Sequence, residues 1–301
     1  MNTRRIKRDV SGVLLLDKPS GITSNAALQI AKRLYRAAKA GHTGILDPMA
    51  SGLLPLCLGE ATKFAQYPTE ADKTYEAVIQ LGVTTDTGDT EGKILSQCAV
   101  TASRSDVERA VKQFTGPIMQ TPPMYSALKH QGQPLYKYAR KGIEIERAPR
   151  AVTLHQIEIL QFDTDVLTIR ATCSKGTYIR VLAEDIGAAL GCGAHLIGLR
   201  RTQVGMFSLG DAITLAALEA LSEAARDEKL LPADCLVMSL PQIALEQDAA
   251  FYLRQGQAIW LPKLQIHQRF RIYDEKHTFM GVGEVSDEGK LQPTRLVVAH
   301  A

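Results

Sequence analysis

The chain has 301 residues, of which 45% are hydrophobic and 22% are charged, and its formal net charge is +3 at pH 7. This length and composition predict a globular protein with a sizeable core, made of two domains or of one large domain. The small positive charge neither requires nor excludes a polyanionic partner, so the distribution of charge along the chain has to decide.

Two further features exclude other classes of protein. The five cysteines are odd in number and no two have C-x-x-C spacing, so neither a disulfide framework nor a zinc site is indicated. A reduced, cytoplasmic protein is expected. The basic amino terminus leads into an apolar run, "VLLL", that is too short for a signal peptide, and no segment approaches membrane-spanning length.

The first elements in chain order are a short buried strand, "GVLLLDKP", and a helix from Ser24 to Lys39. Thr23 or Ser24 is its expected N-cap, and Gly41 lies past its expected end. One face of this helix is apolar, and the other side carries four cations: Lys32, Arg33, Arg36 and Lys39.

The middle of the chain alternates between strands and helices. "GHTGILDP" reads as a loop, and "KTYEAVIQLG" as a strand that places Tyr75, Ala77, Ile79 and Leu81 on one face. "SDVERAVKQF" predicts a helix with a capping box of Ser105 and Glu108. "AVTLHQIEIL" and "VLTIRATCS" predict strands, and "TYIRVLAEDIGAAL" predicts a helix that ends at Gly191.

The segment from about 120 to 150 has weak periodicity and many turn residues, so we expect a long ordered insertion on the surface. Between Lys129 and Arg150 it carries six lysines and arginines against two glutamates, with tyrosines interleaved. Basic side chains contact phosphates and aromatic ones stack on unpaired bases, so the pattern favours RNA binding. A merely solvated surface insertion is the alternative.

From about Leu240 the chain reads as short strands separated by turns, which predicts a small β-rich module at the carboxyl end. The whole is therefore expected to be α+β, followed by a small β-barrel-like module.

Asp47 is the candidate catalytic group. It is a lone carboxylate bordered by Leu46, Pro48 and an apolar run, where desolvation would require a cationic partner to keep it ionised. Such a group can serve as a nucleophile or a base, although an Asp-Pro turn with a structural role is the common alternative. Arg180 is a candidate partner. If it shares a site with Tyr178, the first turn of its helix must still be extended.

The sequence has no metal-binding motif and no phosphate-binding or dinucleotide-binding loop. We therefore expect neither a metal nor a cofactor.

Five ordered blocks carry a resemblance to a known family: "GVLLLDKPSGITS", "AGHTGILDPMASGLLPLCLGEATKF", "KTYEAVIQLGVTTDTGDTEG", "QTPPMYSALKHQGQPLYKYARKG" and "CSKGTYIRVLAEDIGAALGCGAHLIGLRRTQVG". They resemble, in the same order, the bacterial tRNA pseudouridine-55 synthases, and the resemblance covers nearly the whole chain. It implies a mixed-sheet catalytic domain over residues 1–239 with an RNA-clamping insertion at about 120–150. A PUA-like RNA-binding domain over 240–301 is implied by a weaker match.

The resemblance also implies a reaction and its residues. Asp47 would be the nucleophile that isomerises a uridine of the tRNA T loop without cofactor, at C1′, at C6 or as a base at C2′. Arg180 would pair with Asp47, and Tyr75 would stack on the flipped base. Tyr178 and Leu199 would line the pocket and His42 would enter the loop of the RNA. Lys18, Lys129 and Arg140 complete the expected substrate-binding set.

Three alternatives stay open at this point. A non-catalytic RNA-binding protein or tRNA-folding chaperone would use the same surface. A glycosidase-like hydrolase would need a second carboxylate, and none follows Asp47 in its block until Glu60. A relative that works inside a guided ribonucleoprotein would be expected to carry terminal extensions. We expect a monomer that binds the T-arm of tRNA and needs no protein partner or membrane.

Overall fold

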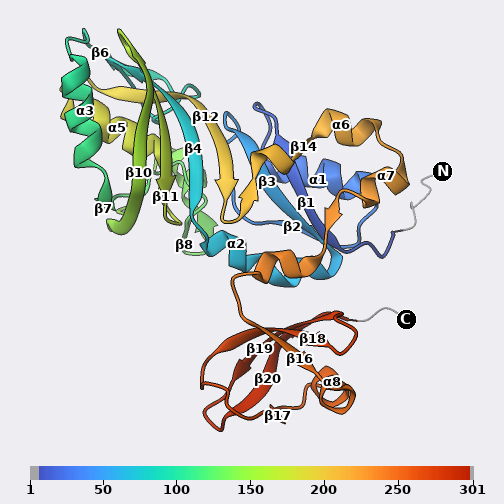
Figure 1. Cartoon of the computed structure of the whole chain (residues 1–301). Coiled ribbons are helices and arrows are strands. Elements are labelled where there is room, and N and C mark those ends of the chain that lie inside the picture. Colours follow the sequence, from blue (N-terminus) through green and yellow to red (C-terminus); the bar gives the residue numbers. More distant parts are fainter. Residues whose placement is uncertain (1–6, 299–301) are drawn as a thin grey trace.

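The computed structural model describes residues 7–298 and is built on one large mixed sheet (Figure 1). The path of this 11-stranded sheet runs β14-β1-β3-β12-β4-β11-β10-β7, with β13, β15 and β2 paired to β12, β1 and β3. Its strands are β1 (Gly12–Lys18), β2 (Ala40–His42), β3 (Ser51–Leu58), β4 (Lys73–Leu81), β7 (Gly116–Gln120), β10 (Arg150–Asp163), β11 (Val166–Cys173), β12 (Ala194–Val204), β13 (Phe207–Ser208), β14 (Ile213–Thr214) and β15 (Leu230–Leu231).

Strands β1 and β3 are buried on both faces, which explains their continuous apolar sequences. Leu14 and Leu16 of β1 belong to one hydrophobic cluster, whereas Val13 and Leu15 belong to a second cluster on the opposite face. Strand β4 alternates instead, with Tyr75, Ala77, Ile79 and Leu81 buried as predicted. A strand with one covered face needs apolar residues only at every second position.

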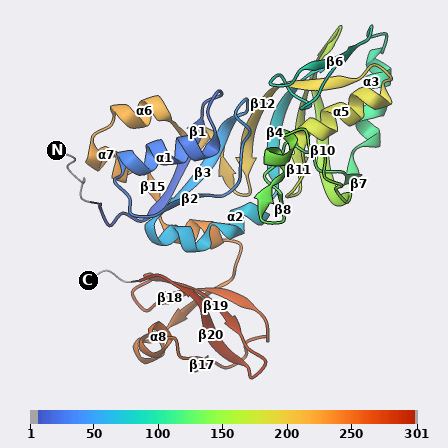
Figure 2. The same ribbon diagram turned by 180° about the vertical axis from the view of Figure 1, so that it is seen from behind.

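Helices cover the first of these faces (Figure 2). α1 (Ser24–Leu34) and α6 (Leu215–Ala220) pack near β1 and β3, and α3 (Arg104–Gln113) and α5 (Ile179–Ala189) pack near β10 and β12. The shorter helical elements are α2 (Gln66–Glu70), α4 (Leu135–Ala139), α7 (Glu223–Asp227), η1 (Gly59–Phe64), η2 (Leu209–Asp211) and η3 (Ala233–Val237). A small hairpin of β5 (Val83–Thr85) and β6 (Ile94–Gln97) precedes α3.

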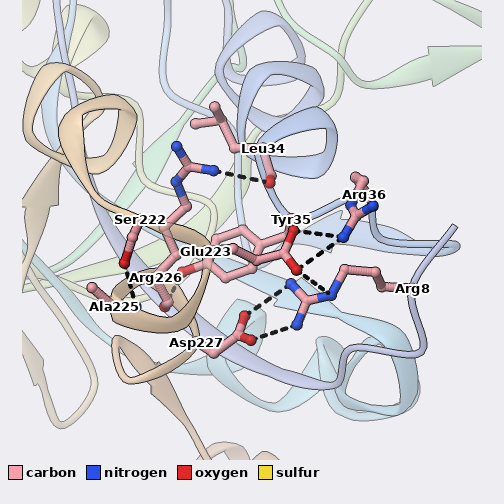
Figure 3. A network of polar contacts seen from close by, with 9 residues as sticks. All are labelled: Arg8, Leu34, Tyr35, Arg36, Ser222, Glu223, Ala225, Arg226 and Asp227. Carbon is pink, nitrogen blue, oxygen red and sulfur yellow. Dashed lines mark hydrogen bonds and ion pairs between the residues drawn. The ribbon is translucent and has the colours of Figure 1, made fainter. Parts of the chain in front are cut away.

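The prediction that the first helix reaches Lys39 is wrong, since α1 ends at Leu34. Its N-cap is Thr23, as expected, but Arg36 adopts a left-handed conformation with φ 52°. Figure 3 shows the reason: Arg36 turns toward α7, where its Nη2 lies 2.6 Å from Glu223 Oε2, and Tyr35 donates a 2.6 Å hydrogen bond to the Arg226 carbonyl.

The same network alters the expected charge of the α1 surface. Arg8 contacts both Glu223 and Asp227, so two arginines converge on two carboxylates of α7 (Figure 3). Arg36 is therefore engaged within the protein, while Arg33 and Lys39 stay exposed.

The capping box of α3 lies two residues earlier than predicted. Ser103 is the N-cap, and the reciprocal partner is Asp106, whose carboxylate accepts a hydrogen bond from the Ser103 amide. A shorter Asp at the third helical position serves as well as Glu, because only the carboxylate has to reach the cap. Val107, Ala110 and Val111 face the core as expected.

The segment between β7 and β10 is an insertion with little regular structure, as predicted. It contains the short pair β8 (Lys129–His130) and β9 (Gln133–Pro134), followed by α4. Leu135 is its buried anchor, and five of its six cations are exposed: Lys129, Lys137, Arg140, Lys141 and Arg150. Arg147 is half-buried and pairs with Glu144.

The carboxyl-terminal module has its own sheet in the order β16-β18-β19-β20-β17 and its own hydrophobic cluster. Its elements are β16 (Gln242–Leu245), α8 (Gln247–Arg254), β17 (Ile259–Trp260), β18 (Arg269–Asp274), β19 (Phe279–Val285) and β20 (Lys290–Leu296). The expected α+β architecture with a small β-rich module is confirmed.

This module packs against the second face of the main sheet. Val282 belongs to the same cluster as Val13 and Phe64, and the Phe64 and Phe279 rings lie 5.3 Å apart. Lys63 Nζ donates to the Leu296 carbonyl and the Val298 amide donates to Glu60. The module therefore completes the core of the sheet as well as forming its own.

No helix among residues 7–298 is long and apolar enough to cross a membrane.

Candidate active site

A pocket of about 460 Å³ opens where β4, β12, the loop after β2 and the start of α5 meet. Six of the nine predicted site residues line it: His42, Asp47, Tyr75, Tyr178, Arg180 and Leu199. They come from four separate stretches of the chain, so the fold alone brings them together.

Asp47 and Arg180 form an ion pair at the base of this pocket. Arg180 Nε lies 3.0 Å from Asp47 Oδ2, and the Arg180 side chain is 5% exposed. The other guanidinium nitrogens donate to the carbonyls of Thr87 and Tyr125, at 2.9 and 2.7 Å. A planar fork held at several points fixes the direction in which it meets the carboxylate.

Arg180 reaches the pocket because the first turn of α5 is preceded by an extended residue. Tyr178, the N-cap, has φ −103° and ψ 111°, which is the local geometry that a shared site requires. Its amide donates to Gln120 Oε1 at 3.0 Å, and Gln120 Nε2 donates back to the Tyr178 carbonyl at 3.3 Å. Gln120 is 2% exposed, so a buried side chain from the end of β7 holds this residue extended.

The surroundings of Asp47 contain groups that raise the pKa of its carboxyl and groups that lower it. Burial raises the pKa of the Asp47 carboxyl above its ordinary value, Arg180 lowers it, and the neighbouring Asp89 carboxylate raises it. The net direction is upward. The Arg180 guanidinium is therefore the principal group that favours the ionised form.

Asp89 is a second carboxylate that the sequence reasoning missed. Its Oδ2 lies 3.5 Å from Arg180 Nη1, and the side chain is 4% exposed. It also accepts hydrogen bonds from Thr87 Oγ1 and the Glu91 amide. Its place in the block "TTDTGDTEG" was visible, but nothing in the sequence spacing joined it to Arg180.

The turn that presents Asp47 is fixed by two side chains of the first strand and helix. Ser24 Oγ accepts from the Leu46 amide at 2.8 Å and donates to the Leu46 carbonyl at 3.0 Å. Lys18 donates to the carbonyls of Pro19 and Ile22, and lies 3.5 Å from that of Pro48. Lys18 has no exposed surface and does not line the pocket.

Lys18 is therefore placed differently from the prediction that it binds substrate. Its position beside Pro48 supports a part in shaping the Asp47 turn instead.

Lys129 and Arg140 lie outside the pocket, on the exposed surface of the insertion. The Arg140 guanidinium stands 5.4 Å from the centre of the Tyr136 ring.

Tyr75 shares the lining of the pocket with polar residues that were not predicted, among them Lys73, Ser126 and Arg201. Lys73 donates to the carbonyls of Pro68, Thr69 and Ala71, and burial lowers its pKa to about 8. Arg201 lies two residues after Leu199 in "GLRRTQ". In a strand, residues two apart point to the same face, and this spacing could have predicted that Arg201 lines the pocket with Leu199.

Within residues 7–298 no group of three or more His, Cys, Asp or Glu side chains is arranged to hold a metal ion.

Family models match this chain in three consecutive stretches. Residues 32–179 match the "TruB family pseudouridylate synthase (N terminal domain)". Residues 180–238 match the "tRNA pseudouridylate synthase B C-terminal domain", and residues 241–297 match "Pseudouridine synthase II TruB, C-terminal".

Whole-chain relatives agree with these matches. A protein named "tRNA pseudouridine synthase B" from Methylobacillus flagellatus is 54% identical, over 99% of this chain and 98% of its own length. One of the same name from Dechloromonas aromatica is 56% identical, over 99% of both. A solved chain titled "Crystal Structure of a Cbf5-Nop10-Gar1 Complex" has 27% identity and a TM-score of 0.72, covering 96% of this chain and 84% of the other. The chain therefore belongs to the TruB family of pseudouridylate synthases.

Proposed function

We propose that the chain isomerises a uridine in the T loop of tRNA, at position 55, to pseudouridine. The observation that carries this proposal is the Asp47–Arg180 ion pair at the base of a pocket large enough for one nucleoside. The full-length similarity to relatives named tRNA pseudouridine synthase B supports tRNA as the substrate. It also favours the enzyme over a non-catalytic RNA-binding protein.

The pocket suits a base that has left its stack. A uridine inside a stacked loop would not present C1′, C5 and C6 to one carboxylate, so the nucleotide has to be extruded. Tyr75 offers a ring for stacking, while Tyr178 and Leu199 give the pocket apolar walls. Asp47 is the nucleophile or base in this proposal, and Arg180 keeps it ionised.

The reaction conserves all atoms of the nucleoside. The N1–C1′ bond breaks, the uracil turns over, and C5 bonds to C1′. The C5 proton then leaves, and N1 takes up a proton. One carboxylate in this position can attack C1′, attack C6 or remove a proton at C2′.

The insertion at 120–150 would hold the T-arm. Its exposed cations suit phosphate contacts, and His42, beside the pocket mouth, would enter the loop. Burial lowers the pKa of the His42 imidazole, with a further contribution from Arg201, which favours the neutral ring suited to stacking among bases. Lys129 and Arg140 belong to the phosphate-contacting set.

We also propose that the chain acts as a cytoplasmic monomer without a protein partner. Light scattering of the free protein and of its tRNA complex would test this, and a second copy or obligatory partner would contradict it.

Release of tritium from C5-labelled uridine in a T-arm transcript tests the proposed function. We expect release and pseudouridine formation in equal amounts at one site per RNA, without added metal or cofactor. A transcript with cytidine at the target position is the matched control. Tight binding with no tritium release would instead favour the tRNA-folding chaperone.

Tyr75→Phe is expected to bind the T-arm as the wild type does but to form pseudouridine much more slowly. The ring stays available for stacking, whereas the hydroxyl that could take part in the C5 proton transfer is lost. Binding by gel shift and single-turnover rate on the same RNA separate the two effects. Full activity of the variant would assign Tyr75 to stacking alone.

We propose that residues 1–239 form the catalytic domain and 240–301 a PUA-like RNA-binding domain. The gap between matches ending at 238 and beginning at 241 supports the division. A chain that ends at residue 239 is expected to lose tRNA affinity more than saturated single-turnover rate, because every pocket residue precedes the cut.

This truncation also uncovers Phe64 and its cluster, so a control is needed for the damaged core. Phe279→Ala keeps the module but weakens its packing on Phe64. If the single-turnover rate collapses in the truncated chain but not in Phe279→Ala, the module is part of the active site. That result would contradict this proposal.

A further inference from the structure

Arg201 has a charged side chain that is buried in the sheet. The reaction described above assigns it no role. It is 1% exposed, and it lines the pocket from the strand position two residues beyond Leu199. Burying a cation is costly unless it is paired, because its hydration is lost.

Its guanidinium is only partly satisfied. Nε donates to the Leu53 carbonyl at 2.8 Å, and Nη1 lies 3.5 Å from the Ile45 carbonyl. Nη2 is buried with no hydrogen-bond partner, and no carboxylate among residues 7–298 forms an ion pair with Arg201. The positive charge is thus left for an oxygen that carries negative charge during the reaction.

The backbone aims this side chain at Tyr75. The two residues are direct cross-strand partners on antiparallel β12 and β4, so their side chains leave the sheet on the same face. The pairing becomes irregular immediately afterwards, between Arg201 and Gln203. On the other side β12 meets β3, where a Cβ on Gly52 would lie 2.3 Å from the Arg201 carbonyl oxygen. Glycine is needed at that approach, and the Arg201 backbone is fixed between two strands.

Tyr75 needs a cation if its oxygen is to accept a proton. Burial raises the pKa of the Tyr75 hydroxyl, and the positive charge of Arg201 is the influence that opposes this most strongly, while the net direction stays upward. The neighbouring Asp47 carboxylate raises the pKa further. Without Arg201 the strongest influence that lowers the pKa of Tyr75 would be lost, while burial and the Asp47 charge would remain.

We propose that Arg201 is a positioning residue of the isomerase, whose Nη2, unpaired in this structure, donates to the Tyr75 oxygen during the reaction and stabilises it as the acceptor of the C5 proton. In this step the C5–H bond of the C5-linked base breaks and its electron pair forms the C5–C6 double bond. The former C6–N1 double-bond pair moves to N1, which takes a proton from water. The Tyr75 hydroxyl first gives its proton to water, and the C5 proton then bonds to the phenolate oxygen, which restores the phenol. The inference rests on the proposed function.

The test compares rates on T-arm RNA that carries either hydrogen or deuterium at C5 of the target uridine. Arg201→Met is expected to slow single-turnover product formation about 100-fold, in the range seen when one electrostatic donor is removed. The deuterium isotope effect should rise above the wild-type value, because proton removal from C5 becomes the slow step. A purely structural loss would lower the rate and leave the isotope effect unchanged, which would overturn the proposal.

A double-variant cycle identifies the group through which Arg201 acts. In a protein that already carries Tyr75→Phe, adding Arg201→Met should lower the single-turnover rate by less than about threefold. The reason is that the Tyr75 oxygen, which Arg201 would stabilise, is already absent. Independent, multiplicative losses would overturn the proposal and indicate that Arg201 acts on the substrate instead.

Arg200→Met is the matched control. Arg200 precedes Arg201 in β12, pairs with Asp17 and does not line the pocket. We expect the isotope effect of Arg200→Met to equal that of the wild type. If it rises as much as in Arg201→Met, the role assigned to Arg201 is overturned.

Arg201→Lys covers the case in which methionine at this position prevents folding. It keeps the charge but has one ammonium group in place of the fork, so an intermediate rate and an intermediate isotope effect are expected. A wild-type isotope effect with a lowered rate would overturn the proposal. If the wild-type protein releases no tritium, the proposed function itself is overturned. If the wild type is active but the Arg201 variants show no change in isotope effect, only the role of Arg201 is overturned.

Discussion

Asp47→Asn is expected to abolish pseudouridine formation while T-arm binding persists. The substitution is nearly isosteric, and the contacts that shape the turn come from the backbone of Leu46 and Pro48, which it leaves in place. An amide is a poor nucleophile and a poor base, so each of the three possible attacks is lost. Arg180 loses one of its two anionic partners, Asp47, and keeps the other, Asp89, so the affinity for RNA should hold or rise slightly.

The measurement is a tritium-release time course and a gel shift on one T-arm RNA, with wild type and variant at saturating enzyme. Asp17→Asn is a useful control because Asp17 is a carboxylate of β1 that pairs with Arg200 and does not line the pocket. Tritium release by Asp47→Asn near the wild-type rate would falsify the assignment of the nucleophile.

Arg180→Lys is expected to give a folded protein that has lost about 2–4 kcal/mol of transition-state stabilisation, as when an electrostatic donor is removed. Lysine keeps the charge but cannot contact Asp47, Asp89 and two backbone carbonyls at once, as Arg180 does. The pKa of Asp47 should therefore rise, and less of it would be ionised at neutral pH.

Single-turnover rate at saturating tRNA measures this loss, with thermal unfolding as the check on folding. Arg170→Lys is the matched control: Arg170 also bridges two carboxylates, Glu76 and Glu158, but on the solvent-exposed side of β11. Surface ion pairs contribute little, so its rate should equal the wild type. If Arg180→Lys turns over as fast as Arg170→Lys, the ion pair with Asp47 is not needed for the reaction.

Local pattern was sufficient for most elements. The alternation in β4 and the apolar run of β1 predicted buried strands, and the short apolar runs after residue 240 predicted the small β-rich module. Where prediction was wrong, a distant contact overrode local preference. α1 ends at Leu34 because Tyr35 and Arg36 contact residues of α7, nearly two hundred positions away in sequence.

Sequence reasoning singled out the site candidates that had an unusual local setting. Asp47 stood out as a lone charge before an apolar run, and Arg180 as a cation at the start of a helix. Asp89, Lys73 and Arg201 had no such setting, because each looks like an ordinary polar residue of a loop or strand. Lys18 was placed among the substrate-binding residues, yet its ammonium group is enclosed by carbonyls beside the Asp47 turn.

Residues close together in the chain were enough to identify the family, the order of strands and helices, and Asp47 as the candidate catalytic charge. Which charged side chains meet follows only from the folded arrangement. The pairing of β12 with β4 puts Arg201 opposite Tyr75, and the contact of Gln120 with Tyr178 turns Arg180 toward Asp47. Such meetings depend on strand register and on buried hydrogen bonds between distant segments, because a shift of one residue would turn each side chain to the other face of the sheet.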